Sequence, residues 1–233
     1  MGASGKPLAA TPSDTSGNVQ LTNDFEYKTK IDVSKDIMKK TDTQTLKSIL
    51  DHVSGMVDKY PDLLKSLKSI DVRGRVNTLA STNGILLGIN TAYFGDPNTV
   101  SLVYDASVDS GYHPKGTTWE NIVDHEMGHV ATYGVITKIH NGNQAAIAKD
   151  WADGSINSTA SKIVHQAMDE VRNNYQAHGY AQKPTYAQLR KELSGYATKN
   201  WHETIAEAWA DYHANGDNAR AISKRIYMAM LNY

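Results

Sequence analysis

The 233-residue chain carries 24 Lys and Arg against 25 Asp and Glu, and its net charge of -1 gives no bias toward nucleic acid or an anionic membrane. It has no cysteine, which excludes disulfides and thiolate metal sites. No apolar run approaches the roughly 18 residues of a spanning helix, and no signal peptide is visible at the N-terminus. We expect a peptide or protein substrate, no nucleic-acid or membrane partner, and a cytoplasmic, virion-associated or secreted location.

Amino-acid composition and hydrophobic periodicity change twice within the first third of the chain. Residues 1–24 are rich in Gly, Ser, Thr, Pro and Ala, which predicts a disordered leader. Residues 25–69 form an N-terminal helical segment, because apolar residues recur at helical spacing from position 34 onward and Pro61 marks a break. The pattern predicts a helical hairpin ahead of the main domain.

Short β-type runs follow at residues 72–79, 84–89 and 99–104, separated by turn signals at 83–84 and 95–97. They predict a small mixed sheet in an α+β domain that spans residues 70–233. Residues 99–105 are our candidate for an exposed edge strand, to which an extended peptide could add as a further strand. The alternative is an ordinary edge strand without a ligand.

The most informative stretch is the H-E-x-x-H motif at residues 125–129. On a helix, His125 and His129 lie one turn apart and can converge on one zinc ion at about 2.0 to 2.1 Å, and Glu126 can act as the base for a water on its open side. Thr117 and Glu120 predict a capping box at the start of this helix. The alternative is an ordinary helix with two solvent-facing histidines.

Gly128 lies between the two histidines. A glycine inside a helix costs roughly 1 kcal/mol relative to alanine. Its presence there predicts the close approach of another element.

We expect a third ligand from a second helix that begins after Asn200. The candidate is Glu203, which lies 74 residues beyond His129. Glu203 and Glu207 lie one turn apart on one face, beside the small residue Ala206. Either they form a solvated acidic stripe, or one binds the metal and the other orients a ligand imidazole through its second nitrogen.

Tyr196, Glu203 and the run Ala206-Glu207-Ala208, after an H-E-x-G-H motif, resemble the catalytic domain of anthrax lethal factor and the Pro-Pro endopeptidases, which are gluzincins. The resemblance implies a zincin-like fold, with the sheet packed on the motif helix and a mainly helical C-terminal lobe. It implies one catalytic Zn²⁺ held by His125, His129 and Glu203. Glu126 would be the general base, Tyr196 the donor to the transition-state oxyanion, and Glu207 the orienting carboxylate.

Several residues near these motifs have a plainer interpretation. Tyr196 is one of 13 tyrosines, most of which serve packing, and only its spacing to Glu203 singles it out. His202 projects away from Glu203 and is expected at the surface or cap. His113 precedes the motif helix in a glycine-containing loop and could border the cleft. Helices between 142 and 195 are predicted to form the second wall of that cleft.

Two functions remain open at this stage. The first is a zinc endopeptidase, a metallohydrolase that cleaves peptide bonds. The second follows from a further resemblance of residues 200–216 to the C-terminal domain of phage minor head proteins. It implies a structural protein with virion components as partners, in which zinc stabilises the fold or the site is vestigial. Glu126 and Tyr196 favour the first, because a structural zinc site needs neither.

Overall fold

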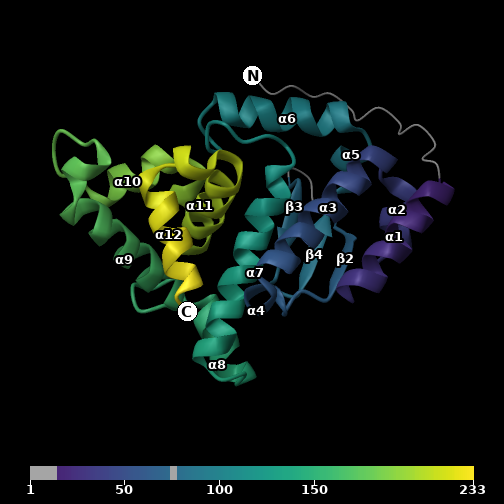
Figure 1. The fold of residues 1–233 in the computed structure, drawn as a ribbon, viewed down its shortest axis with the longest axis horizontal. Helices are drawn as coiled ribbons and strands as arrows, with labels where there is room; N and C mark the ends of the chain where they lie inside the picture. Colours follow the sequence, from purple (N-terminus) through teal and green to yellow (C-terminus); the bar gives the residue numbers. More distant parts are fainter. Residues whose placement is uncertain (1–14, 74–77) are drawn as a thin grey trace.

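The computed structural model describes residues 15–73 and 78–233 of the chain. It is a mixed α+β structure, as predicted, with one small sheet among many helices. In Figure 1 the long helix α7 runs through the middle, with the sheet and α1–α3 on one side and α9–α12 on the other. In the described part of the chain, no helix has the length and apolar content needed to cross a bilayer.

The sheet has four short strands, β1 (Asp32–Val33), β2 (Ser69–Val72), β3 (Ala80–Thr82) and β4 (Leu86–Ile89). Their order is β1-β2-β4-β3. Strands β1, β2 and β4 run parallel to one another, and β3 pairs antiparallel to β4. The mixed sheet and the run at 84–89 are therefore confirmed, although the run at 72–79 contributes only Val72 to β2, and residues 74–77 lie outside the described residues. β3 is an edge strand of the sheet.

Four helices precede or flank this sheet: α1 (Thr15–Thr29), α2 (Lys35–Lys40), α3 (Thr43–Lys59) and α4 (Pro61–Leu64). Residues 15–24 are therefore helical, and the prediction of a disordered leader is wrong there; residues 1–14 lie outside the described residues. Asn18 is fully buried and donates its amide to the carbonyl oxygen of Met38 at 2.7 Å, and Phe25 joins the core. Strand β1 lies within residues 25–69 and pairs with β2, so this segment contributes a strand to the sheet of the following domain.

Residues 99–105, predicted as an edge strand, instead lie in the helix α6 (Pro97–Asp109), which follows the short helix α5 (Thr91–Phe94). The Asp96 carboxylate caps the helix by accepting from the backbone N–H groups of Asn98 and Thr99, and Pro97 occupies its first turn. Val100 and Tyr104, one turn apart, are buried. The capping signals outweigh the β-propensity of the Thr and Val residues.

The motif helix α7 (Asn121–Ile139) has most of its residues buried. The predicted capping box is wrong, because the Thr117 hydroxyl donates to the Pro114 carbonyl oxygen at 2.6 Å and no side chain caps the helix at Glu120. Instead, the Asn121 side-chain oxygen accepts from the backbone N–H of Thr118 at 2.8 Å. A polar turn therefore leads into the helix, which begins four residues later than Thr117.

The C-terminal lobe is mainly helical, as predicted. It comprises α8 (Gln144–Ala152), α9 (Thr159–Asn173), α10 (Tyr186–Leu193), α11 (Trp201–Asn215) and α12 (Ala221–Leu231), with the 3-10 helices η1 (Tyr175–His178), η2 (Tyr196–Thr198) and η3 (Gly216–Asn218). Helix α11 begins after its cap Asn200, as predicted. Helix α9 is capped by Ser158, whose side chain accepts from the backbone N–H of Ser161.

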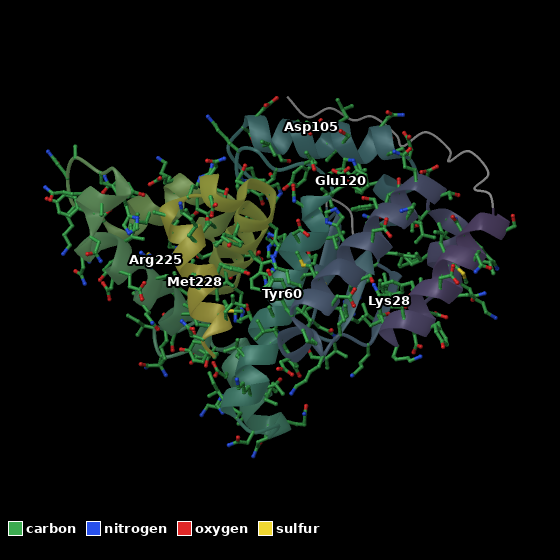
Figure 2. All side chains as sticks on the ribbon, viewed as in Figure 1. Lys28, Tyr60, Asp105, Glu120, Arg225 and Met228 are labelled. Atoms are coloured by element: carbon green, nitrogen blue, oxygen red, sulfur yellow. The ribbon has the colours of Figure 1, made fainter. Side chains whose placement is uncertain are left out.

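Helices α7 and α11 are in close contact, which Gly128 makes sterically feasible. A Cβ atom at position 128 would lie 2.9 Å from both the Ala206 Cα and the Trp209 Cβ, so the predicted close approach is confirmed. Tyr60 reinforces the junction: its ring packs edge-on against Trp209 at 5.2 Å, and its hydroxyl hydrogen-bonds that of Tyr227 at 2.8 Å. Figure 2 shows Tyr60 beside α7, between the two parts of the molecule.

Candidate metal centre and cleft

His125, His129 and Glu203 form a cluster that could hold a metal ion, with their ligand atoms all within 4.8 Å of one another. The Glu203 Oε2 atom lies 3.1 Å from His125 Nε2 and 3.2 Å from His129 Nε2. Tetrahedral zinc with bonds of about 2.0 to 2.1 Å would separate its ligand atoms by about 3.3 Å. The donor types and their spacing both suit zinc.

The Glu203 carboxylate has an unusual environment. Its Oε2 atom is buried and makes no hydrogen bond of ordinary geometry within the described residues, although two imidazole nitrogens face it. Burial alone would raise the pKa of Glu203, but the facing His125 and His129 side chains outweigh burial and hold the pKa far below its usual value. The group is therefore ionised, as a carboxylate ligand must be.

Glu207 lies behind the cluster, on the same helix as Glu203, and is fully buried. Its Oε1 atom is 2.7 Å from His125 Nδ1 and 2.9 Å from His113 Nδ1, and its Oε2 atom accepts from the Ser194 hydroxyl at 2.7 Å. Burial raises the pKa of Glu207, but these imidazoles lower it further than burial raises it. A carboxylate in contact with Nδ1 favours a proton on that atom, which leaves Nε2 of His125 free to bind a metal.

Glu126 faces the cleft from the same helix turn as His125. It is buried, and burial raises its pKa above the ordinary value, while the neighbouring imidazoles of His125 and His129 act in the opposite direction. A carboxyl group with a raised pKa is a stronger base when ionised. Its chemistry therefore suits proton transfer near neutral pH.

Tyr196, the first residue of η2, places its ring 5.6 Å from the ring of His125. Burial raises the pKa of its phenol, and the nearby carboxylates of Glu203 and Glu126 raise it further. The hydroxyl therefore stays protonated and can act as a hydrogen-bond donor. The Lys199 amine lies 4.0 Å from the centroid of the same ring.

Two adjoining cavities flank the cluster. The larger has a volume of about 350 Å³ and the smaller about 280 Å³, and both are lined by Thr78, Ala80, His125, Glu126 and Tyr196. Because they share these residues, they form one cleft that passes the candidate ligands. The edge strand β3 contributes to both cavities, while α6 contributes only to the larger one.

The structure corrects two sequence-based interpretations around the cleft. His202 is partly buried rather than exposed: its ring lies 4.5 Å from that of Trp151, it lines the smaller cavity, and burial lowers its pKa to about 4. It lies outside the ligand cluster. From residues 142–195, only Trp151 lines either cavity among the described residues. Helices α9 and α10 support α11 and α12 instead.

Two residues of the cleft were only weakly signalled by the sequence. His113 does line the larger cavity, as its loop position suggested, but its contact with Glu207 spans 94 positions and could not be anticipated. Lys199 lines the same cavity, and only its position three residues after Tyr196 could have drawn attention to it.

The chain matches no family model, and comparisons with curated proteins and with solved structures find no match either. The gluzincin and phage resemblances of the motifs therefore stay predictions.

Proposed function

We propose that this protein is a zinc-dependent endopeptidase with a zincin-like catalytic domain. The observation that carries the proposal is the convergence of five side chains on one cleft. His125, His129 and Glu203 have the donor types and spacing of a zinc site, and Glu126 and Tyr196 lie beside them on the cleft surface. A structural zinc site requires only the ligands.

The residues present fit a single zinc ion. His125, His129 and Glu203 would hold it, and the otherwise unsatisfied Glu203 Oε2 atom would gain a partner. Bound zinc supplies Lewis acidity, which polarises the scissile carbonyl and lowers the pKa of water. Glu207 would keep the His125 ring oriented toward the ion through its contact with Nδ1.

The remaining chemistry belongs to two side chains. The Glu126 carboxylate accepts a proton from the attacking water and then delivers it to the leaving amine nitrogen. The Tyr196 hydroxyl donates a hydrogen bond to the carbonyl oxygen as negative charge develops there, and one such donor is typically worth a few kcal/mol. Burial keeps the Tyr196 phenol neutral, as a hydrogen-bond donor must be, and burial also raises the pKa of Glu126, which makes its carboxylate a stronger base once it is ionised.

The substrate would lie along β3. This strand replaces residues 99–105 as the candidate docking edge, because it ends the sheet and lines both cavities. A peptide in extended conformation could pair with the edge of β3 that has no partner strand among the described residues, and so pass the metal cluster. An open cleft of this kind also favours a catalytic over a purely structural role, since structural zinc sites are closed by four protein ligands.

The test combines metal analysis with cleavage-site profiling of a broad peptide mixture. Wild-type protein should contain one zinc per chain and cleave peptides. The Glu126→Gln variant should keep the zinc and lose cleavage, because an amide cannot accept the proton of water at neutral pH. Wild-type protein that binds zinc but cleaves nothing would instead support the structural alternative.

A further inference from the structure

The larger cavity is lined by several apolar side chains and by a cation. Five side chains with large apolar surfaces line it, namely Leu79, Tyr93, Val103, Tyr104 and Ile122. The same cavity is lined by Lys199, whereas no Lys or Arg is among the described residues that line the smaller cavity. Among the described residues, the two sides of the candidate metal centre therefore differ in charge.

Among the described residues, the Lys199 amine is held in place without an acidic partner. It donates to the Tyr112 hydroxyl at 2.6 Å and lies over the Tyr196 ring. No carboxylate lies within ion-pair distance of it among the described residues. Outside them, residues 74–77 include no Asp or Glu, and residues 1–14 include Asp14. An ammonium group has three donors, so two remain for solvent or a ligand.

Lys199 is exposed, and two tyrosine rings hold its amine at the cleft. The amine is 4.0 Å from the Tyr196 ring centroid and 5.1 Å from that of Tyr112. Both contacts are attractive for a cation. A positive charge is thus fixed next to the candidate oxyanion donor, where a substrate passing the metal would meet it.

We infer that Lys199 is a specificity-determining residue that binds a substrate carboxylate on the larger-cavity side of the scissile bond. The inference rests on the proposed peptidase function and specifies its substrate class: peptides with an apolar side chain for the cavity and a carboxylate close by. The carboxylate comes either from an Asp or Glu side chain or from the C-terminus of the peptide. The first source keeps the enzyme an endopeptidase, and the second would make it cleave near chain ends.

The experiment uses a matched peptide series and the zinc-loaded full chain. One arm compares an internal Glu with Gln in peptides that have amidated ends, and the other compares a free C-terminus with an amide in peptides without acidic side chains. Wild-type kcat/KM should favour the carboxylate form in one arm by about 2- to 5-fold, the range of a solvent-exposed ion pair. Lys199→Gln should abolish that preference, and Lys199→Glu should reverse it.

Two controls separate charge recognition from other effects. Lys162→Glu changes the net charge by the same amount as Lys199→Glu, but Lys162 lies on an exposed part of α9, outside both cavities, and this variant should keep the wild-type preference. Tyr112→Phe removes the hydroxyl that holds the amine and should weaken the preference without reversing it. If Lys199→Gln slows all peptides alike and leaves the preference unchanged, Lys199 acts on Tyr196 and the inference is overturned.

A binding measurement distinguishes failure of this inference from failure of the proposed function. The same peptides are titrated by calorimetry against zinc-loaded Glu126→Gln protein and its double variant with Lys199→Gln. A carboxylate preference that disappears in the double variant supports the inference even if the wild type cleaves none of the peptides. Equal binding of carboxylate and neutral peptides, or no binding of either, overturns it.

Discussion

The Nδ1 atom of His125 lies 2.7 Å from the Oε1 atom of Glu207, while the Nε2 atom of the same ring faces Glu203. The two carboxylates come from successive turns of α11 and contact opposite nitrogens of one imidazole. This arrangement suits them to different tasks: Glu203 can bind a metal next to His125 Nε2, and Glu207 can orient the ring and favour a proton on Nδ1.

The first prediction separates these tasks. Glu203→Gln should lose zinc during dialysis, whereas Glu207→Gln should retain it with about 10- to 100-fold lower affinity, roughly 1.4 to 2.7 kcal/mol. Competition with a chelator of known affinity measures both values, and circular dichroism checks that each variant is folded. If Glu207→Gln lost the metal more completely than Glu203→Gln, the ligand would be Glu207.

The second prediction concerns Tyr196→Phe. Zinc content and fold should be unchanged, and kcat should fall by about 10²-fold or more with little change in KM, because the lost hydrogen bond forms chiefly in the transition state. Steady-state kinetics with a peptide that the wild type cleaves provides the measurement. A rise in KM at constant kcat would show that Tyr196 serves only to bind substrate.

The third prediction tests the contact between α7 and α11. Gly128→Ala should lower the free energy of unfolding by about 1 to 3 kcal/mol, because the added methyl group meets the Ala206 backbone at 2.9 Å and outweighs the gain in helix propensity. The control is Gly55→Ala in α3, where nothing lies within 4 Å of the added Cβ. That exchange should be stabilising by up to about 1 kcal/mol.

Urea denaturation of both glycine variants, each compared with wild type, measures these changes. Opposite signs for the two variants are expected. A stabilised Gly128→Ala variant would mean that the helices can separate at no cost, contrary to the packing described above.

The fourth prediction uses a histidine away from the ligand cluster. His52 Nδ1 lies 3.1 Å from an oxygen of the buried Asp124, and this contact raises the pKa of His52, while burial opposes it. A raised folded-state pKa stabilises the protein below about pH 6.5, the unfolded value, and the effect is lost as pH rises through the folded value.

The free energy of unfolding of wild type should therefore exceed that of His52→Gln by more at pH 5.5 than at pH 9. Because about a third of the His52 side chain is exposed, the difference should be about 1 kcal/mol or less. Denaturation of both proteins at the two pH values measures it. A difference that grows toward pH 9 would contradict an ion pair with Asp124.

The parts of the site that follow from local spacing could be predicted from the sequence. His125 and His129 share one helix face because they are four residues apart, and Asn200 caps α11 as its residue type suggests. The pairing of α11 with α7 was indicated by Gly128 and Ala206, two small residues whose contact has now been located.

Other features depended on contacts that no local pattern contains. Residues 99–105 contain residues typical of strands, but the cap at Asp96 and the burial of Val100 and Tyr104 make them helical. His113 contacts Glu207, and Lys199 contacts Tyr112. Each of these pairs joins residues that are about 90 positions apart in the sequence. Such proximity arises only when the whole chain has folded.

The apolar contact between α7 and α11 has a consequence for the metal-free protein. Gly128 and Trp209 join the two helices next to the ligand side chains, so the ligands are brought together by packing rather than by the ion. In zinc fingers, by contrast, the metal supplies the folding free energy. A chelator should therefore leave this protein folded and cooperative, and added zinc should restore the proposed peptidase activity without a refolding step, which would make metal supply a rapid and reversible control of that activity.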